Sequence, residues 1–193
     1  MNHIYQEERF GENWFGYEEL YSYFIDQVPV NGTIVEVGCW KGKSIAYLGV
    51  EAVNSNKNIG IYAVDTWLGS NIYEHNSDQS VQNNTLYELF QSNISTIPNI
   101  TPIRLPSVEA SKQFEDLSID AIFIDANHEY EFVRDDIAAW FPKLKKGGLI
   151  GGHDYDGGSN SGHPGVRDAV HEAFGQINII TYPANCWLYR NIK

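Results

Sequence analysis

Apolar residues follow two different spacings along the chain, and the two spacings alternate. Short unbroken apolar runs, typical of strands buried on both faces, are separated by segments whose apolar residues recur as on one face of a helix. The strand-like runs are 33–37, 59–64, 101–105, 121–124 and 149–152. The helix-like segments are 17–28, 45–53, 86–94, 130–141 and 166–174. This alternation predicts an α/β fold with a mostly parallel sheet and helices on both of its faces.

The last two apolar runs predict another kind of connection. Runs 177–181 and 186–189 are joined only by residues 182–185, which are too few for the crossover between parallel strands. We therefore expect an antiparallel hairpin at the end of the chain. The expected organisation is an N-terminal segment and helix over residues 1–30, followed by one domain over residues 31–193.

Composition narrows the class of protein. The 193 residues are 42% hydrophobic and 13% aromatic, which is enough to fill the core of one domain. A formal net charge of −12 repels phosphate backbones and anionic lipid, so we expect no nucleic-acid partner and no membrane partner. The two cysteines have no CxxC spacing, which excludes a disulfide framework and a zinc knuckle. Without a signal-peptide pattern or an apolar run near the ~20 residues that span a bilayer, a cytoplasmic location is expected.

Polar residues gather where the predicted strands end. Glu36 lies near the end of the first strand, Asp65 and Asp125 follow two others, and His153 and Asp154 follow the fifth. In parallel sheets of this kind, ligands bind beyond the carboxyl ends of the strands. We therefore expect the chemistry of the protein at this edge.

The segment 36–44, with the sequence EVGCWKGKS, joins the first strand to its helix. Glycines let the backbone approach a ligand, and a helix N-terminus offers free N–H groups. The end of the segment matches a P-loop, but three residues separate Gly38 from Gly42 where a P-loop has four. Glu36 would also repel a triphosphate. A P-loop nucleotide hydrolase and a tight turn without a ligand are the alternatives left open here.

Asp65 changes the interpretation of this segment. A carboxylate at the end of the second strand can accept hydrogen bonds from both hydroxyls of a ribose, although a surface-turn aspartate is the simpler alternative. The sequence lacks GxGxxG, and Glu36 precedes the loop, so NAD is disfavoured. A nucleoside ligand with a cationic centre and an amino group suits these acids better.

Four blocks of sequence resemble class I S-adenosylmethionine-dependent methyltransferases over about residues 30–190. The similarity is greatest to the small-molecule O-methyltransferase branch, which includes sugar methyltransferases and cephalosporin-hydroxylase-like proteins. The blocks are VEVGCWKGKS (35–44), VDTW (64–67), FIDANHEY (123–130) and LKKGGLIGGHDY (144–155), and the last two are the more specific. The resemblance implies a Rossmann-like, seven-stranded, mostly parallel sheet with an antiparallel last strand.

The resemblance also implies which residues contact S-adenosylmethionine. Gly38 and Gly42 would lie against its methionine part, and Glu36 would face its amino group. Asp65 would hold the ribose, and Asp125 would lie under the sulfonium, followed by Ala126 where many relatives have glycine. The remaining cofactor-binding candidates are Ser44, which we also expect to cap the following helix, Thr66 and Trp67 beside the ribose, and Ser107 and Val108 near the adenine.

Methyl transfer to a hydroxyl requires a group that removes the proton of that hydroxyl. His153 is our candidate base, because an imidazole titrates near neutral pH, and Asp125 and Asp154 complete the predicted catalytic set. Asp125 and Asp154 are also the predicted ligands of Mg²⁺ or another divalent cation, an ion that some relatives hold in this region. Asp156 is a further acidic candidate. For His128 we expect only a helix cap near residue 129 or a hydrogen bond to the adjacent strand.

Several flanking residues have two interpretations. The loops 69–80 and 154–163 either close over the site or are mobile surface. The rings of Trp67, Tyr73 and Tyr155 either face a sugar or aromatic substrate or pack in the core. The aromatic segment 5–15 either packs on a partner, as in a homo-oligomer, or covers the site.

We therefore expect a methyltransferase that acts on a hydroxyl of a small molecule. A methyltransferase-like protein that only binds, and a P-loop hydrolase, are the alternatives. A nucleic-acid base methyltransferase is disfavoured by charge and by the missing Asn/Asp-Pro-Pro-aromatic motif.

Overall fold

The fold is a seven-stranded sheet with the strand order β3-β2-β1-β4-β5-β7-β6. It is taken from a computed structural model, which describes all residues except 12, 71–72, 156–162 and 193. Strands β1 to β5 are parallel, whereas β7 runs antiparallel to both β5 and β6. The strands are β1 (Thr33–Val37), β2 (Gly60–Asp65), β3 (Ile100–Arg104), β4 (Ile119–Ile124), β5 (Leu144–Gly152), β6 (Ile180–Tyr182) and β7 (Cys186–Arg190). The predicted fold class and the predicted terminal hairpin are confirmed.

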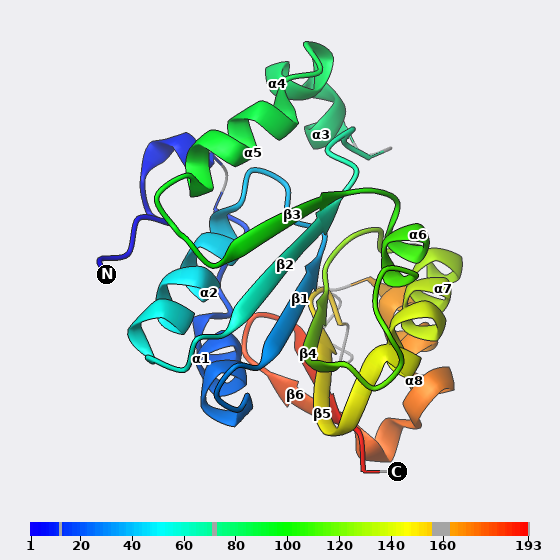
Figure 1. The fold of residues 1–193 in the computed structure, drawn as a ribbon. Helices are drawn as coiled ribbons and strands as arrows, with labels where there is room; N and C mark the ends of the chain where they lie inside the picture. The colour runs from blue at the N-terminus through cyan, green and yellow to red at the C-terminus, as the bar shows by residue number, and fades with distance from the viewer. Residues whose placement is uncertain (12, 71–72, 156–162, 193) are drawn as a thin grey trace.

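Helices cover both faces of the sheet, as Figure 1 shows, because neighbouring strand residues point to opposite sides. Ile34 and Phe123 pack with α1, α2 and α5, whereas Val35 and Ile122 pack with α6, α7 and α8. The short helices α3 and α4 lie beyond the upper ends of the strands in Figure 1. The helices are α1 (Glu18–Gln27), α2 (Lys43–Asn54), α3 (Tyr73–Ser77), α4 (Gln79–Gln82), α5 (Leu86–Ile94), α6 (Ser107–Ser111), α7 (Tyr130–Trp140) and α8 (Pro164–Phe174), with 3₁₀ turns η1 (Glu8–Phe10), η2 (Phe141–Lys143) and η3 (Gln176–Asn178).

Two strands begin at least three residues away from their predicted starts. β5 begins at Leu144 rather than at 149, because Leu144 already pairs with Ile119 of β4. The pairing with β4 is then irregular until Leu149, and Gly147 in this stretch takes a positive φ of 79°. β6 begins only at Ile180, because residues 176–178 form η3 instead of extending the hairpin.

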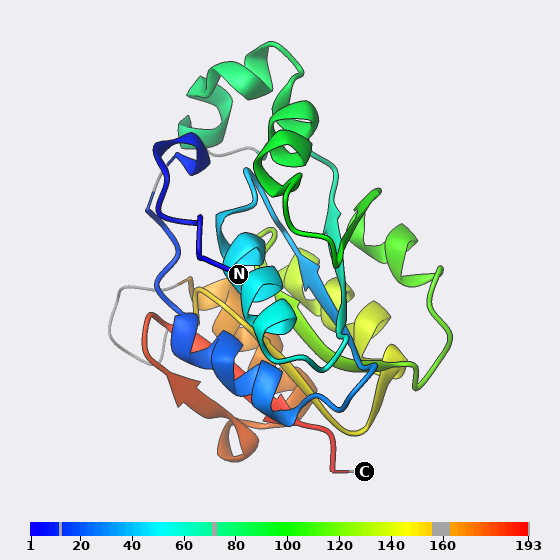
Figure 2. The same ribbon diagram turned by 60° about the vertical axis from the view of Figure 1, so that its left-hand side comes forward.

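The N-terminal segment packs on its own chain. Phe10 is 1% exposed and lies in a cluster with Ala46, Val50 and Ile97, so it joins α2 to the turn after α5. Phe15 is buried in the core that α1 shares with the sheet. These two rings therefore pack inside their own chain, whereas Trp14 of the same segment is exposed, and packing of the segment on a partner stays a prediction. In Figure 2 the helix α1 (blue) lies beside the hairpin, and Tyr23 of α1 contacts Tyr182 of β6.

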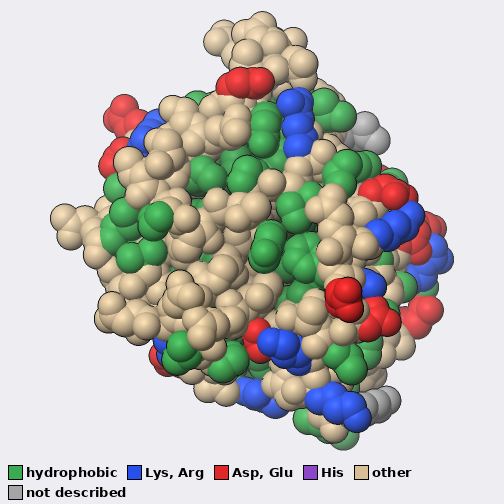
Figure 3. Space-filling view, in the orientation of Figure 1, with side chains coloured by type: hydrophobic (Ala, Val, Ile, Leu, Met, Phe, Trp, Pro, Cys, Tyr) green, Lys and Arg blue, Asp and Glu red, His purple; other side chains and the backbone are tan. Residues whose placement is uncertain are grey.

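The surface is unevenly charged. In Figure 3 acidic and basic side chains gather on the right-hand side, over α6 and α7, whereas apolar side chains occupy much of the centre. None of the helices in the described ranges has the length and apolar character needed to cross a membrane.

Candidate active site

The glycine loop, residues 38–42, lies directly against the end of β4. Gly38 has a φ of 91°, and a Cβ atom there would lie 2.0 Å from the carbonyl oxygen of Asp125. Gly42 has a φ of 89°, and a Cβ atom there would lie 3.1 Å from the ring of Phe90 in α5. Glycine is therefore required at both positions, and the close approach at Gly38 brings the glycine loop and Asp125 to one place.

Asp65 fixes the shape of the glycine loop. Its Oδ2 atom accepts hydrogen bonds from the backbone N–H groups of Cys39 (2.8 Å) and Trp40 (3.0 Å). Its Oδ1 atom accepts one from the N–H of Trp67 at 2.8 Å. A carboxylate offers about four acceptor positions, so Asp65 keeps capacity for one further donor such as a hydroxyl.

Glu36 lies beneath the glycine loop with no exposed surface. Its Oε1 atom accepts a hydrogen bond from the hydroxyl of Ser44 (2.6 Å) and its Oε2 atom accepts one from Tyr21 (2.8 Å). Burial raises the pKa of Glu36 to about 8, against the effect of these two bonds, so the carboxyl is neutral near pH 7. Glu36 is thus enclosed by its own chain in this structure, and a contact with a ligand's amino group stays a prediction.

Ser44 does not cap α2. The chain enters that helix through the left-handed Gly42, which is the N-cap residue, and the first helical residue is Lys43. Because Ser44 lies one residue further inside, its hydroxyl turns to Glu36 instead of to the helix N-terminus.

The other predicted cofactor residues have different surroundings. The ring of Trp67 is buried against Tyr87 and Phe90, so it presents no face to a substrate. The hydroxyl of Thr66 accepts a hydrogen bond from the N–H of Leu68. At the start of α6, the Ser107 hydroxyl accepts a hydrogen bond from the Trp140 indole, whereas Val108 is 40% exposed.

Four side chains meet where β4 and β5 end, and we call them the strand-end cluster: Asp125, His128, His153 and Asp154. Oδ2 of Asp154 lies 2.9 Å from Nε2 of His128 and 3.3 Å from Nδ1 of His153. Oδ1 of Asp125 lies 3.9 Å and 3.5 Å from the same two nitrogen atoms. Acids and imidazoles therefore alternate, and the three predicted catalytic residues lie together.

The strand-end cluster is charged. Burial opposes the cationic form of both imidazoles, but the neighbouring carboxylates outweigh it and raise the pKa of His128 to about 9 and that of His153 to about 10. Burial likewise opposes the ionised carboxyls, yet the two histidines lower the pKa of Asp125 and of Asp154. Near neutral pH the strand-end cluster thus holds two cations and two anions.

Tyr17, which the sequence analysis did not select, completes the site. Its hydroxyl donates to Oδ2 of Asp125 at 2.8 Å, and its ring stacks on Phe123 and lies 5.0 Å from the ring of His153. The sequence signals only that Tyr17 belongs to the apolar face of α1. A contact across 108 positions leaves no local pattern.

Among the residues with two interpretations, His128 does not cap α7, because the N-cap residue is Glu129 and no side chain caps it. The predicted alternative, a bond from His128 across to the neighbouring strand end, is confirmed by Asp154. Tyr155 is 5% exposed and its hydroxyl bonds to His171. Asp156 and the side chain of Tyr73 lie outside the described residues.

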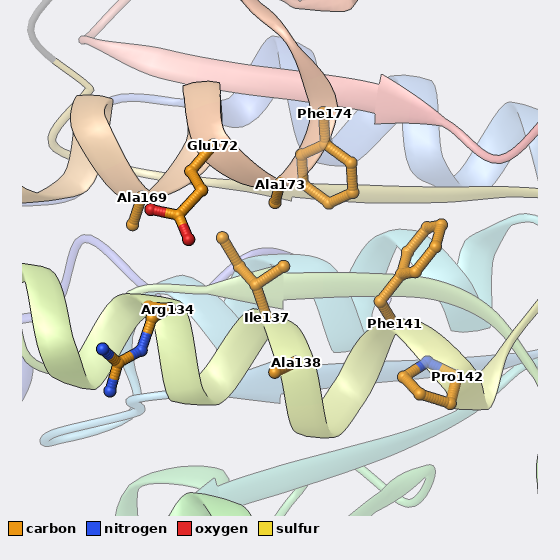
Figure 4. Close-up of a pocket in the computed structure, with 9 residues that line it drawn as sticks. All are labelled: Arg134, Ile137, Ala138, Phe141, Pro142, Ala169, Glu172, Ala173 and Phe174. Carbon is orange, nitrogen blue, oxygen red and sulfur yellow. The ribbon is translucent and has the colours of Figure 1, made fainter.

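A separate hollow of about 290 Å³ lies between α7 and α8, as Figure 4 shows. It is lined by the apolar side chains of Ile137, Phe141 and Phe174, with Arg134 and Glu172 at one end. None of the predicted site residues lines it, so it is distinct from the edge where the strands end.

The fold and this edge define a Rossmann-like protein with a glycine loop after β1 and a charged cluster after β4 and β5. A family model described as a methyltransferase domain matches residues 35–155, which is more than half of the chain. The chain belongs to this methyltransferase family. A search of curated proteins found no match.

Solved structures share the fold at low sequence identity. The O-methyltransferase NovP is 16% identical with a TM-score of 0.63, and the match covers 91% of this chain and 79% of that one. The calicheamicin methyltransferase CalS11 is 15% identical with a TM-score of 0.65, covering 90% and 76%. A putative rRNA methylase from Clostridium thermocellum is 16% identical with a TM-score of 0.56, covering 88% and 92%. These likenesses show the fold and leave the acceptor open.

Proposed function

We propose that this protein transfers the methyl group of S-adenosylmethionine to a hydroxyl of a small molecule, such as a sugar, a phenol or a natural product. The observation that carries the proposal is that the glycine loop and the strand-end cluster touch each other at one edge of the sheet. The glycine loop, held by Asp65, packs at Gly38 against the backbone of Asp125, and Asp125 belongs to the strand-end cluster. A methyl donor bound at the glycine loop and an acceptor hydroxyl bound at the strand-end cluster would therefore lie next to each other.

The residues around the glycine loop suit this cofactor. Asp65 has capacity for a ribose hydroxyl, and Val108 offers exposed apolar surface for the adenine. The ionised Asp125 favours a sulfonium nearby. Beneath the loop, Glu36 and its partner Ser44 support Gly38 and Gly42 from below. Thr66, Trp67 and Ser107 act through the shape of the adjoining turns.

The strand-end cluster is proposed to orient and deprotonate the acceptor. When bound, S-adenosylmethionine supplies an electrophilic methyl group, and the acceptor oxygen has to lie in line with the bond that breaks. Asp125 and Asp154 would hold the ring of His153 and so orient it toward the single proton of the acceptor hydroxyl. His153 would take that proton, and this requires the neutral imidazole, which is the minor form below pH 10.

Mg²⁺ does not fit this cluster well. Asp125 and Asp154 supply carboxylate oxygens, but imidazole nitrogens lie between them at 2.9 to 3.9 Å. Mg²⁺ prefers a shell of oxygen ligands and retained waters. We therefore draw no step of the reaction through Mg²⁺.

The test is a methylation assay with labelled S-adenosylmethionine over a panel of sugars and phenols. We expect transfer of label to at least one hydroxyl acceptor, and calorimetric binding of S-adenosylhomocysteine. Binding of the cofactor product without transfer to any acceptor would favour the alternative of a protein that only binds. Absence of both would contradict the proposal.

Two other candidates are weaker. Membership of the methyltransferase family excludes the P-loop hydrolase. An RNA acceptor, which the likeness to an rRNA methylase raises, is disfavoured by the net charge of −12. A homo-oligomer stays a prediction.

A further inference from the structure

Two histidines flank Asp154 at the edge of the strand-end cluster. Nε2 of His128 lies 2.9 Å from Oδ2 of Asp154, and the rings of His128 and His163 are 4.4 Å apart. One donor atom from each of the three residues lies within 4.8 Å of the other two. His163 was not among the residues that the sequence analysis proposed for chemistry.

Backbone structure places all three side chains. Asp154 lies two residues after the end of β5, in a left-handed conformation with a φ of 58°. The N–H of His163 donates to the carbonyl of Asp154 at 2.8 Å, and His163 is the N-cap residue of α8. His128 lies in the short connection between β4 and α7. The three donors thus come from segments fixed to the sheet or to a helix end.

The types of donor atom indicate which kind of ion the three residues would bind. Two imidazoles and one carboxylate suit divalent transition metals, whereas Mg²⁺ and Ca²⁺ favour oxygen ligands. Donors about 2.1 Å from an ion lie roughly 3.0 Å apart around an octahedral ion and roughly 3.4 Å apart around a tetrahedral one. Nε2 of His128 and Oδ2 of Asp154 lie 2.9 Å apart, close to the octahedral spacing, and the ion would displace the proton that His128 holds in this ion pair. His163 is exposed, so its ring can turn toward them.

We propose that His128, Asp154 and His163 bind a divalent transition-metal ion, such as Zn²⁺, Mn²⁺ or Fe²⁺, through two imidazoles and one carboxylate. Three protein ligands leave positions open for water or for an oxygen of the acceptor. Because Asp154 also contacts His153, the ion would lie beside the reacting end. Metal binding here requires neither the cofactor nor methyl transfer, so it can fail or succeed independently of the proposed function.

The test uses Co²⁺ as a probe, because its visible absorption changes with nitrogen ligands. Protein stripped with EDTA is titrated with Co²⁺, with and without millimolar Mg²⁺. We expect one ion per chain that Mg²⁺ does not displace. His163→Ala and His128→Ala should each weaken binding by more than about 100-fold, because removing a ligand costs more than the 10–100-fold typical of outer-shell changes.

The control is His3→Ala, which removes an exposed histidine that also pairs with a carboxylate, that of Glu51, far from the site. It should leave Co²⁺ binding unchanged. Thermal melting of each variant checks that it folds. Unchanged binding in folded His163→Ala, or no binding by the wild type, overturns the proposal. Loss of binding in His153→Ala with retention in His163→Ala also overturns it, because the ion would then lie between Asp125, His153 and Asp154. Calorimetry with S-adenosylhomocysteine on the same samples tests the cofactor site separately.

Discussion

Two acids, Glu36 beneath the glycine loop and Asp125 in the strand-end cluster, each accept a hydrogen bond from a tyrosine of the N-terminal region, yet the two carboxyl groups differ in charge. Glu36 is sealed beneath the loop with Tyr21 and Ser44 and is neutral near pH 7. Asp125 meets Tyr17 but also two imidazoles, and its side chain is 19% exposed, so it is ionised. Neighbouring cations and solvent, rather than position at a strand end, decide which acid can do chemistry.

The helical repeat explains why the two tyrosines serve two sites. Tyr17 precedes α1 and Tyr21 lies in its first turns, four residues later, so both point to the sheet. One reaches the end of β4 and the other reaches β1. The N-terminal segment and helix, predicted as a part separate from the domain, thus supply a side chain to each half of the candidate site.

Replacement of each acid by its amide gives the largest expected contrast. Asp125→Asn removes the negative charge that faces His153 and, in the proposed function, the sulfonium, so it should lower turnover about 10²–10³-fold. Glu36→Gln replaces a neutral acid by a neutral amide and should leave turnover near wild type at pH 7. The measurement is kcat with an acceptor found in the panel, and equal losses in the two variants would contradict the distinction between the acids.

The pH dependence of activity tests His153 as the base. Its pKa of about 10 means that the neutral form grows about tenfold per pH unit through the neutral range. We expect kcat/KM to rise with unit slope and to level off near pH 10. A flat profile between pH 7 and 9 would remove His153 as the base and leave it as a fixed cation.

Stability against pH tests the glycine loop. The pKa of Glu36 is raised from 4.5 to about 8 in the fold, so its stabilisation is complete below pH 4.5 and is lost as the pH rises toward 8. The free energy of unfolding of Glu36→Gln, measured with urea, should therefore rise relative to that of the wild type between pH 5 and pH 8, by at most about 1.4 kcal/mol per pH unit. If the difference in unfolding free energy between the two proteins does not change with pH, Glu36 is not a buried neutral acid.

Below pH 4 the opposite dependence is expected from the strand-end cluster. Asp125 and Asp154 have lowered pKa values, so their stabilisation is present above 3.8 and is lost as they take up protons. Glu36→Gln should not change the loss of stability below pH 4. One series of unfolding measurements against pH therefore separates the effects of the two regions.

Replacement of Tyr17 or Tyr21 by phenylalanine gives the smallest expected effect, and the two variants are closely matched because each loses one hydroxyl. Tyr17→Phe and Tyr21→Phe each remove one buried hydroxyl that donates to a carboxyl group, and each should cost about 1–3 kcal/mol in unfolding free energy. Only Tyr17→Phe should shift the pH profile of activity, because only Tyr17 touches Asp125. A shift of equal size in Tyr21→Phe would show that α1 acts on both regions through its packing alone.

Much of the fold follows from local pattern. Unbroken apolar runs predict buried parallel strands, and the acids that end them predict where Asp65, Asp125, His153 and Asp154 gather. Strand parity also carries information on Glu36, because it shares a face with Ile34, which packs toward α1 and α2. That parity explains why Glu36 turns away from the open edge.

The remaining features depend on contacts that no local pattern records. Tyr17 and His163 reach the site from segments distant in sequence, through the position of α1 and through a backbone bond to Asp154. Ser44 missed its predicted capping role because a left-handed glycine shifts the start of α2. The pKa of His153 required knowing that two carboxylates converge on one nitrogen.

The central claim is that the glycine loop and Asp65 hold S-adenosylmethionine beside Asp125, and titration calorimetry with S-adenosylhomocysteine tests it most directly. We expect one site per chain in the wild type and in Glu36→Gln, with clearly weaker binding in a folded Asp65→Ala variant. No heat of binding in the folded wild type, or full affinity in Asp65→Ala, would contradict it.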